Sequence, residues 1–286
     1  MNNIKIGNIE IGDGQPLVLI GGPCVIETED IVLKTAESVK KIADKLAMPF
    51  IFKSSYLKDN RSSADSYQGI GLEKGLKILQ KVKDTFGIPV LSDIHDQHDA
   101  EACAEVLDVI QIPAFLSMQT SLLLAVAKTG KVINVKKGQF LAASDMQTAV
   151  NKITGVGNNK IMLTDRGTFF GYHNLVLDMR NLKIMRDLGY PVILDPTHSI
   201  RKYGVSSSDR RGGAKEFIFP LTRAGVAAGV DGIFIETHPD CDSALCDAAS
   251  MLPLQKLETL LTQAKALDEI IKPNLQDDEK GIYDYK

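Results

Sequence analysis

Eight short apolar runs, each followed by a longer segment with helical spacing, most strongly constrain how this 286-residue chain can fold. The runs are rich in Val, Ile, Leu and Phe, residues that favour β-strands. They occupy residues 16–22, 49–55, 88–94, 109–114, 131–137, 160–165, 191–197 and 232–238. We therefore expect eight strands.

The segments that follow these runs repeat apolar residues every three or four positions, which is the spacing of a helix with one buried face. In the first segment Ile31, Val32, Ala36 and Val39 show this spacing. The eight segments cover residues 29–46, 72–86, 97–106, 119–128, 144–153, 174–188, 213–228 and 253–271. We expect each of them to form a helix.

Strands that alternate with helices build a parallel sheet, and right-handed crossovers can close eight strands into a (β/α)8 barrel, the TIM-barrel fold. The alternative is an open, doubly wound sheet, but such sheets usually have about five or six strands, and no GxGxxG motif follows the first strand here. No linker or low-complexity segment interrupts the alternation. The sequence thus predicts an α/β chain that forms a single barrel domain over residues 1–286.

Both ends of the chain lie outside this alternation. Within residues 1–14, four isoleucines alternate with polar residues on either side of a Gly-Asn pair, which indicates a β-hairpin. We expect this hairpin to plug one end of the barrel. Residues 272–286 are mostly polar, and we expect them to form a C-terminal tail.

The overall composition excludes several classes of partner. The formal net charge of −3 favours neither nucleic acid nor an anionic membrane, so any anion site must be local. No apolar stretch approaches the ~20 residues that span a bilayer, and the N-terminus lacks the apolar core of a signal peptide. The four cysteines show no CxxC spacing, and we expect reduced thiols in a cytoplasmic protein.

Polar residues gather where the predicted strands end, whereas Pro, Ile and Val stand where they begin. In a (β/α)8 barrel, catalytic residues lie at the carboxyl ends of the strands. This asymmetry therefore favours an enzyme. The polar residues at the strand ends are Cys24, Lys53, Ser92, Asp93, His95, Gln111, Lys136, Lys137, Asp165, Arg166, Asp195, His198, Glu236 and His238.

The loop after the second strand, residues 52–63 with the sequence FKSSYLKDNRSS, combines cations with hydroxyl and amide donors. Lys53, Lys58 and Arg61 suit phosphate or carboxylate oxygens, and barrel closure would bring Lys136 and Arg166 near them. A substrate that carries both a carboxylate and a phosphate needs several such donors. The alternative is a basic surface loop whose cations pair with nearby aspartates.

Cys24, His198 and Glu236 belong to the first, seventh and eighth strands, which become neighbours when a barrel closes. Together they offer sulfur, nitrogen and oxygen ligands for a divalent transition metal. The alternative is a buried free thiol and a histidine satisfied within the core. The loop after the eighth strand offers a fourth ligand, with the candidates His238, Asp240, Cys241, Asp242, Cys246 and Asp247.

Three further residues carry potential chemistry but are more typical of structural roles. Cys103 lies among apolar residues of a predicted helix, where we expect a core position. His173 precedes a predicted helix and fits a capping or packing residue, and His98 opens a helix where we expect it to be exposed.

With these residues in place, the chain resembles the 3-deoxy-D-manno-octulosonate 8-phosphate synthases, specifically their metal-dependent branch. The resemblance runs from GGPCVIE at residues 21–27 to CDAASMLPL at residues 246–254. KDNRSS at residues 58–63 is close to the family's KANRSS, and the KPRTS-type loop of the related synthase of aromatic biosynthesis is missing. The other matching pieces are IQIPAFL, INVKKGQF, DRGTFFGYHNLVLDMR, PTHS and ETHPD.

The resemblance implies a homotetrameric barrel that condenses phosphoenolpyruvate with D-arabinose 5-phosphate and water and releases phosphate, for lipopolysaccharide biosynthesis. It places phosphoenolpyruvate at Lys53, Ser55, Lys58, Lys136 and Arg166 and the pentose phosphate at Asn60, Arg61 and Ser62, and we expect Asp93 and Gln111 in the same site. It implies Cys24, His198, Glu236 and Asp247 as ligands of one Mn, Fe, Co or Zn ion. We expect the catalytic residues to be Lys58, Lys136, His198 and Asp247.

The chain departs from the family pattern around the second substrate. Met118 stands where the family has an Arg that reaches the sugar phosphate of a neighbouring subunit, and the segment IRKYGVSSSDRRGG replaces the family's QLPGG type. We hypothesise that this segment forms a lid and restores the missing cation through Arg201, Lys202, Arg210 or Arg211. The alternatives are a sibling synthase that uses another aldose, a metal-dependent aldolase that does not use phosphoenolpyruvate, and a non-catalytic barrel.

Overall fold

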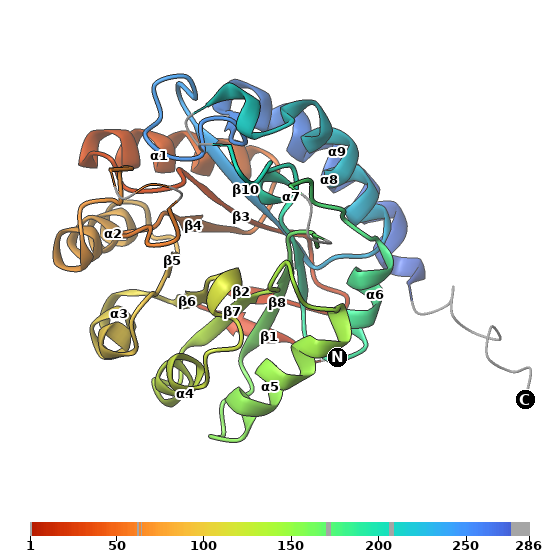
Figure 1. The fold of residues 1–286 in the computed structure, drawn as a ribbon. Helices are drawn as coiled ribbons and strands as arrows, with labels where there is room; N and C mark the ends of the chain where they lie inside the picture. Colours follow the sequence, from red (N-terminus) through yellow and green to blue (C-terminus); the bar gives the residue numbers. More distant parts are fainter. Residues whose placement is uncertain (1, 62, 64, 170–172, 206–208, 276–286) are drawn as a thin grey trace, which may run out of the picture.

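The apolar runs form the strands that the sequence predicts, and these strands pair in parallel around a closed barrel (Figure 1). The computed structural model describes residues 2–61, 63, 65–169, 173–205 and 209–275. The strands are β3 (Val18–Gly22), β4 (Phe50–Lys53), β5 (Val90–Asp93), β6 (Val109–Ile112), β7 (Val132–Lys136), β8 (Ile161–Asp165), β9 (Val192–Leu194) and β10 (Gly232–His238).

The barrel is closed by β10, which pairs with both β3 and β9. Gly232 lies opposite Val18 on one side and opposite Ile193 on the other. An open sheet would leave two edges unpaired, so the doubly wound alternative is excluded. The predicted (β/α)8 barrel is confirmed.

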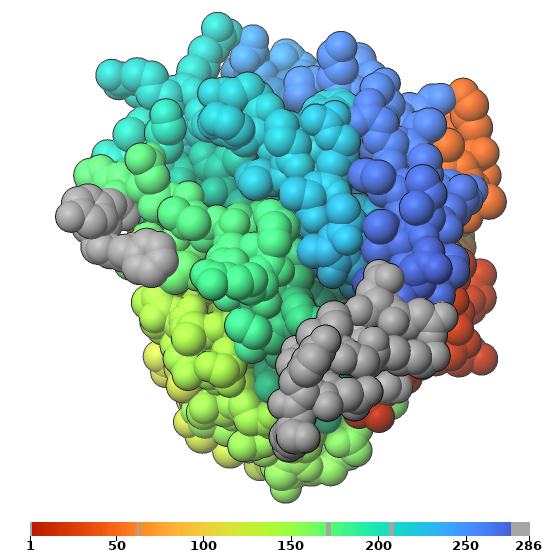
Figure 2. All heavy atoms as spheres, turned by 90° about the vertical axis from the view of Figure 1, so that its right-hand side faces the viewer, coloured from red at the N-terminus to blue at the C-terminus, as the bar shows by residue number. Residues whose placement is uncertain are grey.

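Helices surround the barrel and cover its outer face (Figure 1). Helices α8 and α9 pack against each other, and Figure 2 shows them side by side, α8 in cyan and α9 in blue, on the outer surface. The helices are α1 (Glu29–Lys45), α2 (Leu72–Phe86), α3 (Ala100–Val106), α4 (Thr120–Lys128), α5 (Met146–Thr154), α6 (Arg180–Arg186), α7 (Pro196–Ser199), α8 (Ile218–Ala227) and α9 (Leu257–Ile271). Among the residues described, no helix is both long enough and apolar enough to cross a membrane.

Local sequence signals explain where the first helices begin and end. The hydroxyl of Thr28 accepts a hydrogen bond from the backbone N–H of Ile31 at 3.2 Å, which caps α1 at its N-terminus. Gly87 ends α2 in the left-handed conformation with φ of 62°, which a residue without a Cβ adopts at little cost.

Several predicted segments differ from the structure. The helices predicted over residues 213–228 and 97–106 begin at Ile218 and Ala100, each after a 3₁₀ turn. The helix predicted over residues 174–188 begins only at Arg180, because the preceding segment forms a bridge between Val176 and Thr168. The helix predicted over residues 253–271 begins at Leu257, after the short strand β11 (Leu252–Pro253) and a 3₁₀ turn. The predicted tail starts with a 3₁₀ helix at Lys272–Asn274, and residues 276–286 lie outside the described part of the chain.

The inside of the barrel changes from apolar to polar along the strands. Side chains of a strand alternate between its two faces, so residues two positions apart point the same way. Ile51, Leu91 and Phe234 belong to one buried apolar cluster inside the barrel. Two positions further along their strands stand Lys53, Asp93 and Glu236, which are also buried. The polar interior therefore lies at the carboxyl end of the barrel, as the sequence predicts.

The N-terminal hairpin closes the opposite end. Strands β1 (Ile4–Ile6) and β2 (Ile9–Ile11) pair antiparallel. Their four isoleucines are buried and join the apolar cluster inside the barrel, whereas Lys5 and Glu10 between them are exposed. The predicted plug is confirmed.

Candidate active site

Lys53 is fully buried at the carboxyl end of the barrel. Its Nζ donates to Glu236 Oε1 at 2.6 Å and to the carbonyl oxygen of Cys24 at 2.7 Å. Burial alone would raise the pKa of Glu236, but the charges of His198 and Lys53 lower it below its usual value. Lys53 therefore holds Glu236 ionised in a site with almost no contact with water.

A second group of polar side chains centres on Asp93. Ser55 and Lys58 both donate to its carboxylate, Lys58 over 3.3 Å, and His95 Nε2 lies 3.4 Å from it. Burial acts to raise the pKa of Asp93, but Lys58 and His95 hold it well below its usual range. Asp93 thus fixes two residues of the basic loop at the mouth of the barrel.

Lys136, Asp195 and His198 form a third group. Lys136 Nζ donates to Asp195 Oδ2 at 2.5 Å, and His198 Nδ1 lies 2.7 Å from the same oxygen. Burial lowers the pKa of Lys136, although Asp195 opposes this shift, so this lysine gives up a proton more readily than an exposed one. The backbone N–H of His198 also donates to Asp195, at the start of α7, and this orients the imidazole.

Two groups of potential metal ligands share Asp247. His198, Glu236 and Asp247 form one group and Cys24, Cys246 and Asp247 the other, with the ligand atoms of each group within 4.8 Å of one another. His198 Nε2 is 3.6 Å from Glu236 Oε2 and 3.5 Å from Asp247 Oδ2. Burial raises the pKa of the Cys24 thiol well above its usual value, so binding a metal here must displace a proton.

A cavity of about 250 Å³ opens beside these groups. Four cations line it, namely Lys58, Arg61, Arg166 and Arg201, and the one acid among its lining residues, Asp247, accepts a hydrogen bond from Arg201. Nη1 of Arg166 is buried and has no hydrogen-bond partner among the described residues. A buried guanidinium donor without a partner fits an anionic ligand. The other lining residues are Asn60, Phe115, His198, Tyr203, Gly204 and Val205.

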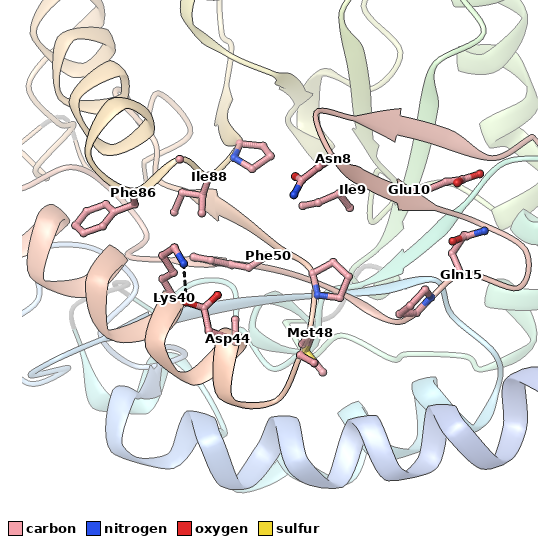
Figure 3. A pocket seen from close by; sticks show the side chains of 16 residues that line it. Asn8, Ile9, Glu10, Gln15, Lys40, Asp44, Met48, Phe50, Phe86 and Ile88 are labelled. Carbon is pink, nitrogen blue, oxygen red and sulfur yellow. Dashed lines mark hydrogen bonds and ion pairs between the residues drawn. The ribbon is translucent and has the colours of Figure 1, made fainter.

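A larger cavity, of about 660 Å³, lies at the other end of the barrel, between the hairpin and helices α1 and α2 (Figure 3). Its charged pair, Lys40 and Asp44, is already satisfied internally at 2.5 Å. Phe50, Phe86 and Ile88 contribute apolar surface. The polar groups of this cavity do not converge as those of a catalytic site do. We therefore assign the active site to the carboxyl end, although the cavity there is smaller.

Comparison with known proteins agrees with this geometry. The model of the DAHP synthetase I family matches residues 2–273. The chain belongs to this family. Proteins named 2-dehydro-3-deoxyphosphooctonate aldolase are similar to this chain over nearly their whole length. Those of Trichlorobacter lovleyi and Geotalea daltonii are 52% identical over 269 residues and 53% over 272, covering 94% and 95% of this chain and 98% and 100% of theirs.

The structure brings most of the predicted site residues to the carboxyl end of the barrel, and their roles remain predictions. Asn60 and Arg61 line the cavity, whereas Ser62 lies outside the described residues. Gln111 does not line it, because its side chain accepts from Asn134 at 3.0 Å inside the barrel.

The arginines of the segment proposed as a lid differ in whether they line the cavity. Arg201 lines the cavity. Arg210 and Arg211 do not reach it, because they are more than 80% exposed and pair with Asp242 and Asp209. Residues 206–208 lie outside the part of the chain that the structure describes.

Cys103, His98 and His173 are the residues for which the sequence predicts structural roles. Cys103 is fully buried in the apolar core and His98 is largely exposed, so both predictions are confirmed. His173 is exposed, its ring lies beside Gly204, and its carbonyl accepts from the N–H of Tyr203.

Sequence reasoning gave no role to two residues that organise the site. Asp195 binds both Lys136 and His198, and its position at a strand end was the only signal for it. Tyr203 receives a hydrogen bond from Gln139 at 3.2 Å, and Arg166 stacks over its ring at 5.7 Å. No local pattern marks Tyr203, because its partners belong to other loops.

The predicted metal ligands fit a divalent transition metal. Glu236 Oε2 is buried and has no hydrogen-bond partner within the described ranges, although its other oxygen is satisfied by Lys53. An oxygen in this state, close to an imidazole and a second carboxylate, suits a cation. Thiolate, imidazole and carboxylate donors together favour Zn²⁺, Fe²⁺, Co²⁺ or Mn²⁺ over Mg²⁺ or Ca²⁺.

Proposed function

We propose that this protein condenses phosphoenolpyruvate with D-arabinose 5-phosphate and water, giving 3-deoxy-D-manno-octulosonate 8-phosphate and inorganic phosphate. The cavity with four cations carries this proposal, because one anionic group would not need so many donors. Family membership and the names of the relatives support it.

Phosphoenolpyruvate carries a carboxylate and a phosphate, and we assign them to the cations deepest in the site. Lys58 and Arg166 line the cavity, and Lys136 reaches it from β7 through His198. The unpartnered Nη1 of Arg166 is the donor with the most to gain from an anion. Lys53 and Ser55 act indirectly, because they hold Glu236 and Asp93.

The pentose phosphate is assigned to the outer part of the cavity. Asn60 and Arg61 contribute from the basic loop, and Arg201 contributes from the segment after α7. Arg61 contacts Cys246, and Arg201 contacts Asp247. Because Cys246 and Asp247 are consecutive residues, the two guanidinium groups lie near each other. Two neighbouring guanidinium groups suit a phosphate dianion. Arg201 would then provide the charge that Met118 does not.

The reaction forms one carbon–carbon bond. C3 of phosphoenolpyruvate attacks the aldehyde carbon, the aldehyde oxygen takes up a proton, water adds at C2, and collapse of that centre releases phosphate. Lys136, whose pKa is lowered by burial, can donate or accept a proton through the hydrogen bonds it shares with Asp195 and His198. A metal bound by Cys24, His198, Glu236 and Asp247 would orient and polarise the aldehyde.

Phosphate release from phosphoenolpyruvate in the presence of a panel of aldoses tests this proposal. We expect release with arabinose 5-phosphate and none from the Lys136→Met variant, which controls for contaminating phosphatases. Release only with another aldose would favour a sibling synthase. Cleavage of a keto-sugar phosphate without any use of phosphoenolpyruvate would favour an aldolase and overturn the proposal.

We further propose that the enzyme requires a divalent metal. A chelator should abolish activity, and Mn²⁺, Co²⁺, Fe²⁺ or Zn²⁺ should restore it to different degrees. Cys24→Ser should bind the metal more weakly, because a hydroxyl is a poorer ligand than a thiolate. Full activity of protein shown by elemental analysis to be metal-free would contradict the requirement.

We also propose a cytoplasmic homotetramer. Phe115, Phe140 and Val176 are large apolar side chains that are 42%, 49% and 52% exposed near the carboxyl end of the barrel, and burial between subunits would remove them from water. Light scattering should give four times the mass of the chain. A monomer at micromolar concentration would contradict this assembly.

A further inference from the structure

Two cysteine thiols lie in direct contact at the edge of the cavity. Cys24 Sγ and Cys246 Sγ are 2.8 Å apart, although the two residues are separated by 222 positions in the sequence. Both side chains are almost fully buried. Cys24 follows β3 and Cys246 lies in the loop after β10, so the contact exists only because these strands pair in the closed barrel.

The pair is part of the potential metal centre. The sulfurs of Cys24 and Cys246 and a carboxylate oxygen of Asp247 lie within 4.8 Å of one another, and Asp247 also belongs to the group with His198 and Glu236. Asp247 therefore joins two adjacent groups of ligands, which together contain five side chains. The family's ligand set uses four of them and leaves Cys246 without a role.

The backbone directs two consecutive side chains to this place. In an extended segment, neighbouring residues such as Cys246 and Asp247 would point to opposite sides. Asp247 instead has φ of 52°, in the left-handed region, and its carbonyl accepts from the N–H groups of Ser250 and Met251. This tight turn lets both residues present ligand atoms to the same centre.

Cys246 differs from the other buried thiol of its loop in its polar contacts. Arg61 Nη1 donates to Cys246 Sγ at 2.9 Å. The sulfur of Cys246 therefore has two polar partners, the guanidinium of Arg61 and the sulfur of Cys24. Cys241, a buried thiol in the same loop, differs, because its nearest polar partners are the carbonyl oxygens of His238 and Met251, at 3.8 and 3.6 Å.

We propose that Cys246 is a second thiolate ligand of the metal, beside Cys24. This inference rests on the metal requirement proposed above. A site with two sulfurs is softer than a site with one, so it should favour Zn²⁺, Fe²⁺ or Co²⁺ more strongly over Mn²⁺. Cys246 would thereby select the metal as well as bind it.

Cobalt spectroscopy counts the thiolates directly, because each Co²⁺–thiolate bond contributes charge-transfer absorption in the near ultraviolet. The protein is stripped of metal, kept reduced and free of oxygen, and titrated with Co²⁺ alone. We expect the absorption per bound Co²⁺ to fall to about half in Cys24→Ser and in Cys246→Ser, and to vanish in the double variant. Cys241→Ser is the matched control and should keep the full absorption.

The single variant Cys24→Ser is decisive even if Cys246→Ser does not fold. It retains absorption if Cys246 is a ligand and loses all of it if Cys24 is the only thiolate. In a competition between Zn²⁺ and Mn²⁺, Cys246→Ser should lose a larger factor in Zn²⁺ affinity than in Mn²⁺ affinity. Full absorption in Cys246→Ser with one Co²⁺ bound would overturn the inference, whereas failure of the wild type to bind Co²⁺ would instead refute the metal centre itself.

Discussion

Replacing Lys53 by Met tests the buried ion pair that supports the site. The Lys53 and Glu236 side chains are 1% and 0% exposed, and the substitution leaves both oxygens of Glu236 without a hydrogen-bond partner among the described residues. Breaking a buried pair by removing one member costs about 3–5 kcal/mol, because an uncompensated charge stays buried. With roughly 2–4 °C of melting temperature per kcal/mol for a chain of about this size, we expect a loss of roughly 6–20 °C.

Scanning calorimetry of the metal-free protein measures this loss, and two variants control it. Lys41→Met removes an exposed helical pair with Glu37, where the two atoms lie 2.6 Å apart, and should cost at most about 0.5 kcal/mol. Adding Glu236→Gln to Lys53→Met should recover much of the loss, because no buried charge remains. A Lys53→Met loss as small as that of Lys41→Met, or no recovery in the double variant, would refute the reasoning.

The stability loss in Lys53→Met should also depend on pH. The pKa of Glu236 in the folded wild type is below its usual value of 4.5, despite its burial, because His198 and Lys53 are close. Its contribution to stability is therefore complete above that value and is lost as the pH falls through the lower folded pKa. In Lys53→Met the unpaired carboxyl takes up a proton more readily, so the difference between the two proteins should shrink as the medium becomes acidic. A difference that stays constant down to about pH 3 would contradict this linkage.

Three other substitutions test the cavity and its support. Arg166→Ala should weaken phosphoenolpyruvate binding more than tenfold, since a charged hydrogen bond contributes about 1.5–3 kcal/mol, and an unchanged affinity in calorimetric titration would remove Arg166 from the site. Asp195→Asn should lower the free energy of unfolding, measured in urea, by an amount that is constant at neutral pH and shrinks below about pH 3.8. The reason is that His198 and Lys136 hold the pKa of Asp195 low against the effect of burial. Arg201→Gln should raise the KM for arabinose 5-phosphate several-fold, whereas Arg210→Ala with Arg211→Ala should leave it unchanged; equal KM values in all of these proteins would place the sugar phosphate elsewhere.

The order of elements was readable from the sequence because each signal for it is local. The apolar runs and the helical spacing fix where strands and helices form, and the position of polar residues just after each run marks the functional end of the barrel. Lys53 and Glu236 follow apolar residues by two positions, so a period of two places them inside the barrel. Cys103 was recognisable as a core residue for the same reason, since it sits on the apolar face of its helix.

Tertiary structure alone decided which of these residues meet. Lys53 pairs with Glu236 across 183 positions and Cys24 with Cys246 across 222, because closure places β10 between β9 and β3. Nothing in the composition of the segment after α7 distinguishes Arg201, which enters the cavity, from Arg210, which faces solvent. A backbone bridge joins Arg201 to Gly213, and such a contact between residues twelve positions apart leaves no periodic trace in the sequence.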